Sequence, residues 1–412
     1  MTEGKRKVFR TILVRISDDR SKHVIMLFFL ALIICTLTCC STPAIKDIQS
    51  EIDSISARFV QDKRLGICKI SCRAGESNTL ILTGETTDFQ AKQEVIKTLD
   101  NKGISLIDSI LILPDTVNNK KYMGLVNLSV INLRKEPDHR AELVSQAILG
   151  TPVLVLKNKN SWLLIQTPDK YIAWTERSSV YLMSREEMDE WRKSERVIYL
   201  ENSGWIYSGP GESAIVGDLV AGCILQKSGE SQSFVDVIFP DGRTGVVIKK
   251  TVMSFDTFRS QTIKDAGGVI KRALSLLGVP YLWGGSSTKG VDCSGFVQTV
   301  YFNNGLILLR DASLQSLHGS PVEVSEGFSN LREGDLLFFG SRENSVLHVT
   351  HVAIYKGDSE YINSSGRVMI NSLDSTHANY NSYRRRSLLA ARRIIDVDDD
   401  PGIVLVKRHL WY

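Results

Sequence analysis

The chain has 412 residues, of which 43% are hydrophobic and 23% charged, a balance that fits a globular protein of two to four domains. Its formal net charge of +4 lies entirely in the first 22 residues, which hold seven basic and three acidic side chains. The rest of the chain is neutral overall. The basic character is therefore no sign of nucleic-acid binding, and no nucleic-acid partner is expected.

The amino-terminal segment has the composition of a secretion signal. An apolar run from Val24 to Thr38 follows the basic residues and is shorter than the roughly 20 residues that span a bilayer. Leu37-Thr38-Cys39-Cys40-Ser41 then resembles a lipoprotein signal, which implies a signal peptide over residues 1–39 and acylation of Cys40. Acylation of Cys39 and a retained membrane anchor remain as alternatives.

The pattern over residues 43–115 predicts a small α/β module. A helical start is followed by a strand near 79–82, a helix across 91–101 and a strand near 107–113. This order is similar to BON domains, and a spacer domain is the alternative. Cys68 and Cys72 have no second cysteine pair beside them, so they are expected to be half-buried strand residues and not a metal or redox pair.

A repeat with an offset of 72 residues follows this module. Leu149-Gly150 corresponds to Ala221-Gly222, and each glycine precedes an apolar strand. The repeat predicts two small β-barrels, over residues 121–182 and 197–253, which resemble bacterial SH3 domains. Residues 184–194 between them have helical composition and predict a connector. Such barrels bind cell wall or pack beside a neighbouring site, and we favour packing for the first.

The next signal is one cysteine at the start of a predicted helix. Gly284-Gly285 indicates a loop, Asp292 is a good N-cap, and apolar residues recur at helical spacing from Phe296 onwards. Cys293 therefore lies in the first turn, where unpaired N–H groups and the helix dipole favour a thiolate and a lowered thiol pKa. A buried, inert cysteine is the alternative, unless a base lies nearby.

A candidate base lies in a predicted hairpin further along the chain. His348 to Asp358 reads as a strand that enters a tight turn, and Glu360 to Ser364 as the returning strand. A hairpin centred on Gly357 places His351 opposite Asn363 on one face, close enough for the amide oxygen to accept an imidazole N–H. A Gly357-Asp358 two-residue turn would put Asn363 on the other face.

Cysteine, histidine and asparagine in this order are a cysteine-protease set. The segment 258–395 resembles the NlpC/p60 cysteine peptidases, through Tyr281-x-Trp283-Gly284-Gly285, Asp292-Cys293-Ser294-Gly295-Phe296, Leu309-Arg310-Asp311, Gly334-Asp335-Leu336, His351-Val352-Ala353-Ile354-Tyr355 and Tyr361-Ile362-Asn363. The resemblance implies an α+β chain with a C-terminal papain-like domain. It also implies Cys293 as nucleophile, His351 as base, Asn363 where the family often has histidine, and Tyr281 as an oxyanion donor.

Two SH3-like domains before such a domain resemble the layout of γ-D-glutamyl-L-diamino acid endopeptidases, or dipeptidyl-peptidases VI. That subgroup cleaves L-Ala-γ-D-Glu from the diamino acid of wall peptides and holds the free amine of L-Ala with acids. The resemblance implies substrate contacts at Asp292, Ser294, Trp283, Glu142, Tyr171 and Arg310, the last of these suited to a carboxylate. Arg310-Asp311-Ala312-Ser313 departs from the Arg-Asp-Ser of many members, which leaves a direct serine contact open.

The expected partners are peptidoglycan-derived peptides and a membrane bound through a lipid anchor, in the periplasm or at the outer membrane. No cofactor or metal is expected, the oligomeric state is left open with a monomer favoured, and residues 396–412 are unassigned. Three alternatives remain: a D,L-endopeptidase of intact peptidoglycan, a non-catalytic wall-binding lipoprotein, and an acyltransferase that uses the same cysteine.

Overall fold

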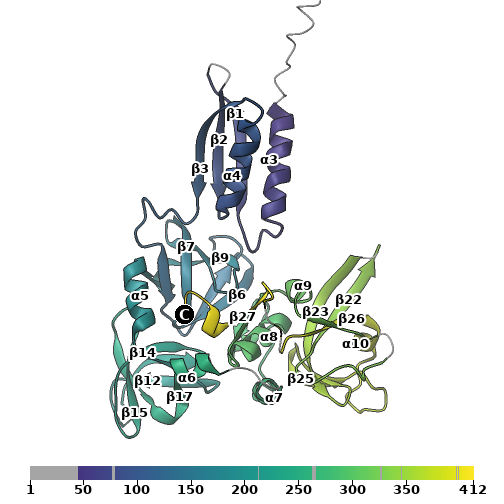
Figure 1. Ribbon diagram of the computed structural model, residues 1–412. Coiled ribbons are helices and arrows are strands. Elements are labelled where there is room, and N and C mark those ends of the chain that lie inside the picture. The colour runs from purple at the N-terminus through teal and green to yellow at the C-terminus, as the bar shows by residue number, and fades with distance from the viewer. Residues whose placement is uncertain are drawn as a thin grey trace, which may run out of the picture.

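The computed structural model describes residues 45–76, 79–211, 213–261, 266–324, 327–344, 346–395, 397 and 399–412. The predicted signal peptide and Cys40 lie outside these residues. No helix within the described ranges is long and apolar enough to cross a bilayer. Helices and sheets both contribute throughout, so the α+β expectation is confirmed (Figure 1).

The N-terminal unit is a three-stranded sheet covered by two helices (Figure 1). Its elements are α3 (Ile45–Phe59), β1 (Cys68–Ala74), β2 (Thr79–Thr86), α4 (Phe89–Asp100) and β3 (Ser105–Ile112). β2 lies between an antiparallel β1 and a parallel β3, and residues such as Ile52, Leu82 and Leu99 are buried between sheet and helices. Both cysteines of β1 are free and half-buried, as expected.

The predicted repeat is present as two seven-stranded sheets with the same connectivity. The first repeat contains β4 (Met123–Val126), β5 (Val130–Arg134), β6 (Leu143–Ile148), β7 (Pro152–Lys159), β8 (Trp162–Gln166), β9 (Ile172–Glu176) and β10 (Val180–Met183). The second repeat contains β11 (Arg196–Tyr199), β12 (Ser203–Tyr207), β13 (Ile215–Val220), β14 (Ile224–Glu230), β15 (Phe234–Ile238), β16 (Thr244–Ile248) and β17 (Val252–Ser254).

The offset of 72 residues is kept in the backbone of the two repeats. Gly150 and Gly222 both adopt positive φ, 79° and 91°, in the turns that lead into β7 and β14. A 3₁₀ turn precedes the last strand of each repeat, at Arg177–Ser179 and at Lys249–Thr251. Between the repeats lies α5 (Arg185–Lys193), which begins with a capping box. The predicted connector helix is therefore confirmed.

The C-terminal unit packs helices against a six-stranded antiparallel sheet of order β21-β26-β22-β23-β24-β25. Its elements are α6 (Phe255–Ser260), α7 (Gly267–Leu274), β18 (Ser286–Ser287), β19 (Gly290–Val291), α8 (Cys293–Phe302), β20 (Leu306–Leu308), α9 (Ala312–Gln315), β21 (Ser320–Val322), β22 (Leu336–Glu343), β23 (Val346–Gly357), β24 (Glu360–Ser365), β25 (Arg367–Ser372), α10 (Ser382–Ser387), β26 (Leu388–Arg393) and β27 (Ile403–Leu405).

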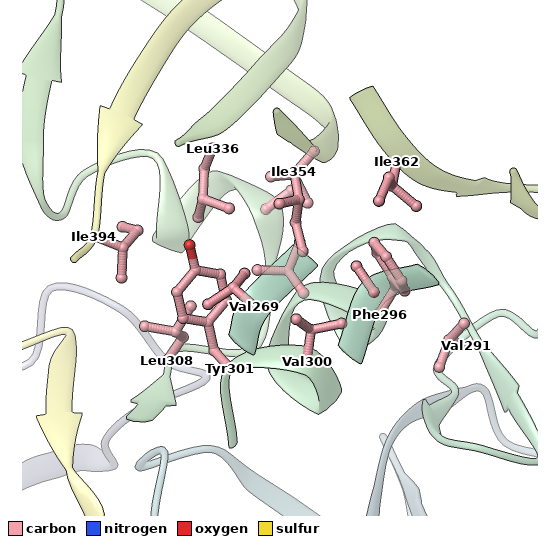
Figure 2. Packing of buried hydrophobic residues seen from close by; sticks show 14 of the residues in the cluster. Val269, Val291, Phe296, Val300, Tyr301, Leu308, Leu336, Ile354, Ile362 and Ile394 are labelled. Atoms are coloured by element: carbon pink, nitrogen blue, oxygen red, sulfur yellow. The ribbon is translucent and has the colours of Figure 1, made fainter. Parts of the chain in front are cut away.

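The core of this unit fixes α8 against the sheet. Phe296, Val300 and Tyr301 of α8 meet Leu336 of β22 and Ile354 of β23 (Figure 2). All five side chains are fully buried. Because side chains alternate between the faces of a strand, burial of Val352 and Ile354 against α8 turns His351 and Ala353 to the other face. The packing of α8 thus sets the orientation of the residues around His351.

The hairpin register differs from the expected one. Tyr355 pairs with Tyr361, not with Ser359, and the turn residues are Asp358 and Ser359, both at positive φ. This turn alone would place Asn363 on the face opposite His351. A bulge between Tyr355 and Gly357 adds one residue and restores the face, so His351 and Asn363 lie diagonally on the same side.

Candidate active site

Cys293 is the first residue of α8, as predicted, and Asp292 caps the helix by accepting a hydrogen bond of 2.7 Å from the Gly295 N–H. The expected lowering of the thiol pKa does not occur in the structure. Burial raises the pKa of Cys293, and the charge of Asp292 adds to this. The N–H groups of Val352 and Ser294 at the sulfur act in the opposite direction but are outweighed.

His351 and Asn363 meet as the sequence predicted, with 3.0 Å between Nε2 and Oδ1. The Asn363 amide nitrogen donates to Met369 O at 3.3 Å and to Asn371 Oδ1 at 3.0 Å, which turns its oxygen towards the imidazole. Nε2 therefore carries the hydrogen, and Nδ1 is left as the basic atom. Burial lowers the pKa of His351 to about 3, and the Arg384 charge contributes, so the imidazole is neutral at pH 7.

β23 passes the start of α8, so the backbone next to His351 lies at Cys293. Val352, which follows His351, places its N–H at the Cys293 sulfur. Tyr281 lies at the same place, since the charge of Cys293 acts on its hydroxyl and burial raises the pKa of Tyr281 to about 12. The phenol is therefore protonated at neutral pH and able to donate a hydrogen bond.

Asp292, which directly precedes the nucleophile, forms a buried ion pair with Arg310. Arg310 is 1% exposed, and its Nη1 and Nη2 reach the two oxygens of Asp292 at 3.1 and 2.5 Å. Arg310 also donates to Ser294 Oγ at 2.8 Å and to Ser145 Oγ at 3.1 Å. With its donors engaged in this way, Arg310 does not face the cleft as a ready carboxylate ligand. The expectation of a direct substrate contact is replaced by a supporting position.

A cleft opens beside Cys293 and collects most of the predicted substrate contacts. Its lining includes Arg64, Glu142, Val144, Tyr171, Tyr281, Trp283, Gly284, Asp292, Cys293, Ser294, Asp311, Ala312, Ser313, Val349 and Thr350. Glu142 and Tyr171 come from the first repeat, which therefore forms one wall. Glu142 Oε1 accepts a hydrogen bond of 3.1 Å from Trp283 Nε1 across this boundary. Among the described residues, no group of three His, Cys, Asp or Glu side chains could hold a metal ion.

The cleft also contains residues that were not predicted as substrate contacts, among them Asp311, Ser313 and Arg64. Asp311 follows Arg310 directly, so its place in the motif was a usable signal, and Ser313 lies two residues beyond it. Ser313 is also the serine whose role the extra Ala312 had left open. Arg64 comes from the N-terminal unit, and nothing in the surrounding sequence indicates a position next to Cys293.

Fold and site together define a papain-like cysteine peptidase. Residues 278–387 match the NlpC/P60 family, and residues 133–180 match the bacterial dipeptidyl-peptidase SH3 domain. Dipeptidyl-peptidase 6 of Lysinibacillus sphaericus is 30% identical over 269 residues, which are 62% of this chain and 94% of that protein. The chain belongs to the NlpC/P60 family and is a cysteine peptidase.

Two further relatives agree with this assignment. A γ-D-glutamyl-L-lysine dipeptidyl-peptidase of Bacillus cereus is 28% identical, with 54% of this chain and 67% of that protein aligned. The crystal structure of an NlpC/P60 family protein from Bacillus cereus superimposes with a TM-score of 0.57 at 23% identity. It covers 66% of this chain and 99% of its own, and it supports the fold.

Proposed function

We propose that the chain hydrolyses the γ-D-glutamyl-L-diamino acid bond of peptidoglycan peptides that begin with a free L-Ala. The observation that carries this proposal is the wall that the first repeat adds to the cleft, with Glu142 and Tyr171 on the same cleft as Cys293. The carboxylate of Glu142 on this wall favours an ammonium group in the cleft. The relatives named as γ-D-glutamyl-L-lysine dipeptidyl-peptidases support this substrate class.

In the proposed reaction, His351 Nδ1 takes the proton of Cys293 as the sulfur attacks the amide carbonyl. Asn363 holds the imidazole through Nε2, and the Cys293 N–H and the Tyr281 hydroxyl donate to the developing oxyanion. The C–N bond breaks and the leaving amine takes the proton from His351, which leaves a thioester. Water then adds with His351 as base, and the thiol and the free carboxyl group are released.

The assignment is tested with purified protein and L-Ala-γ-D-Glu-L-Lys as substrate. Cys293→Ala should abolish hydrolysis while circular dichroism stays unchanged, and Cys68→Ala, on a strand of the N-terminal unit, should keep full activity. Iodoacetamide should inactivate the wild-type protein, and chelators should not. Loss of activity with chelators, together with an active Cys293→Ala protein, would contradict a thiol mechanism.

Cleavage of intact wall is the second candidate function, because other relatives include a DL-endopeptidase. The free tripeptide, with L-Lys or diaminopimelate, is compared with the same peptide attached to muramic acid. An acylated terminus lacks the ammonium group that the cleft carboxylates attract, so kcat/KM should fall on the order of a thousandfold. Glu142→Gln should slow only the free peptide. Equal rates on both substrates would favour the endopeptidase of intact wall.

A relative named as a muramidase and DL-endopeptidase supports a location outside the cytoplasm. We further propose a lipid anchor on Cys40. Cys40→Ala should leave the precursor unprocessed and abolish incorporation of labelled fatty acid. If Cys39→Ala alone has this effect, the lipidated residue is Cys39. If the protein stays membrane-bound without label in both variants, it has a retained membrane anchor instead.

A further inference from the structure

The N-terminal unit reaches the substrate cleft through one loop. Residues 60–67 connect α3 with β1, and they precede both family-matched segments, 133–180 and 278–387. The loop is fixed to the first repeat: Arg64 O accepts from Ile172 N at 2.8 Å, and Leu65 O accepts from Gln166 Nε2 at 3.0 Å. The side chain of Leu65 also packs on the core of the first repeat. The backbone of Arg64 is therefore held at the cleft wall.

The guanidinium of Arg64 joins the loop to the C-terminal unit. Nη1 donates to Asp311 Oδ2 at 2.8 Å and to Ser313 Oγ at 3.2 Å. Nε and Nη2 donate to Asp62 at 2.9 and 2.5 Å. The side chain is 38% exposed and lines the same cleft as Cys293. One arginine from outside the family-matched segments thus holds two polar groups of the catalytic cleft.

The charges around Arg64 leave room for a cation in the cleft. Asp62 accepts hydrogen bonds from Arg64 through both carboxylate oxygens, and its pKa is lowered mainly by this contact, so it stays ionised. Asp62 thereby balances the arginine charge. Arg64 engages only Oδ2 of Asp311, which leaves Oδ1 for a ligand. The group as a whole is anionic, although it contains an arginine.

The ionisation of Asp311 depends on its neighbours. Burial raises the pKa of Asp311 and the charge of Asp292 adds to this, whereas Arg310 and Arg64 lower it. Tyr171 faces the same carboxylate and is uncharged, because burial raises the pKa of its hydroxyl. Removal of Arg64 therefore favours the protonated form of Asp311, which no longer attracts an ammonium group.

We propose that Arg64 is a positioning residue of the peptidase: it holds the Asp311 carboxylate and the Ser313 hydroxyl where the ammonium end of the substrate peptide binds. The N-terminal unit is then part of the substrate site and not a spacer. This inference rests on the proposed function, since it needs a substrate with a free amine.

Steady-state kinetics on L-Ala-γ-D-Glu-L-Lys test the proposal with the full mature chain. Arg64→Ala should raise KM on the order of tenfold, with kcat within about twofold of wild type. The acid limb of kcat/KM should move to higher pH, because the pKa of Asp311 rises when the arginine is removed. Arg64→Lys should recover a large part of the loss, since it keeps the charge near Asp311. Lys63→Ala, at an exposed neighbouring position, is the matched control and should match wild type.

Three results would overturn the proposal. In the first, KM and the pH profile of Arg64→Ala equal those of wild type. In the second, Arg64→Lys is as impaired as Arg64→Ala and both variants lose thermal stability, which is the result expected if the loop is only a structural spacer. A wild-type protein that does not cut the free tripeptide removes both this inference and the proposed function. The alkylation rate of Cys293 by iodoacetamide separates a loss of substrate positioning from a general loss of structure. If only substrate positioning is lost, this rate should be the same in Arg64→Ala and in wild type.

Discussion

At the scale of single residues, the environment of His351 decides its charge. His351 is 5% exposed, lies against the tilted ring of Phe339 with 5.8 Å between ring centroids, and has Asn363 as its polar partner. An uncharged partner orients the ring without stabilising its charged form as a carboxylate would. The imidazole is therefore neutral and able to accept the proton of Cys293.

This environment predicts a loss of stability in acid. The pKa of His351 is about 3 in the folded protein and 6.5 in the unfolded chain, so the unfolded chain binds the proton first as pH falls. Stability from this group is present above pH 6.5 and is lost between about pH 6.5 and 3. Urea unfolding should show a loss of about 2 kcal/mol from this residue between pH 7 and 5, and the loss should be absent in His351→Gln.

Arg384 supplies part of the same effect. Its charge lowers the pKa of His351, so Arg384→Gln should raise that pKa and make the acid loss shallower. Arg385→Gln is the matched control, because Arg385 is exposed on the same helix and stacks on Phe328 instead. Titration of His351 by NMR in each variant measures the shift. Equal shifts in both variants would show that the effect is not specific to Arg384.

The ion pair of Asp292 and Arg310 makes a second prediction at this scale. Asp292→Asn keeps a side chain that can cap α8 but leaves the buried Arg310 charge unpaired, so the free energy of unfolding should fall by about 3–5 kcal/mol. Adding Arg310→Met should recover part of this loss. Asp138→Asn, in an exposed pair with Arg140, should have no measurable effect.

At the scale of elements, the β23–β24 hairpin decides whether the base meets its orienting residue. Lys356 is the extra residue of the bulge, and Gly357 closes it with φ of 104°, a conformation that favours glycine. Without the bulge, the Asp358-Ser359 turn would pair His351 with a different residue and direct Asn363 to the opposite face.

Gly357→Val should therefore lower both stability and kcat/KM. A valine at this φ is strained by about 1–2 kcal/mol, which favours a regular ladder and separates His351 from Asn363. Deleting Lys356 in the same variant should restore activity, because a regular ladder with one residue fewer keeps Tyr355 opposite Tyr361. Failure of the deletion to restore kcat/KM would mean that the bulge matters for another reason.

At the scale of the whole molecule, residues 399–412 tie the units together. β27 pairs with β20, and His409 Nε2 donates to Pro168 O of the first repeat at 3.1 Å. Tyr412 is 3% exposed and packs against Phe255 and Phe302. The surrounding hydrophobic cluster contains residues of both repeats, of α5 and of the C-terminal unit. The segment that the sequence left unassigned thus lies at their junction, as the yellow ribbon of Figure 1 shows.

Tyr412→Ala should destabilise this junction by about 3–5 kcal/mol, the usual cost of removing a buried aromatic side chain. Because Glu142 and Tyr171 reach the cleft only if the first repeat stays in place, kcat/KM for the free tripeptide should fall as well. Leu410→Ala, at a position 78% exposed, should change neither quantity. Thermal unfolding and steady-state kinetics of both variants provide the comparison.

Much of the candidate site follows from local sequence patterns. Helix capping and apolar spacing placed Cys293 at the start of α8, and the strand pattern placed His351 and Asn363 on neighbouring strands. The repeat was visible because Gly150 and Gly222 recur with an offset of 72 residues, each before an apolar strand. The helix and strand signals depend on residues close together in the chain, where propensity and spacing have direct physical meaning.

Contacts between distant segments had no such signal. The observed hairpin register depends on a bulge. The pairing of Arg310 with Asp292 depends on the burial of both side chains. The position of Arg64 depends on a loop that the first repeat holds in place. The thiol pKa likewise follows from how deeply the fold buries Cys293, which outweighs the helix terminus. Sequence alone determined which residues are able to do the chemistry. The tertiary structure decided their partners and charges, because burial and long-range pairing are set only when the units pack together.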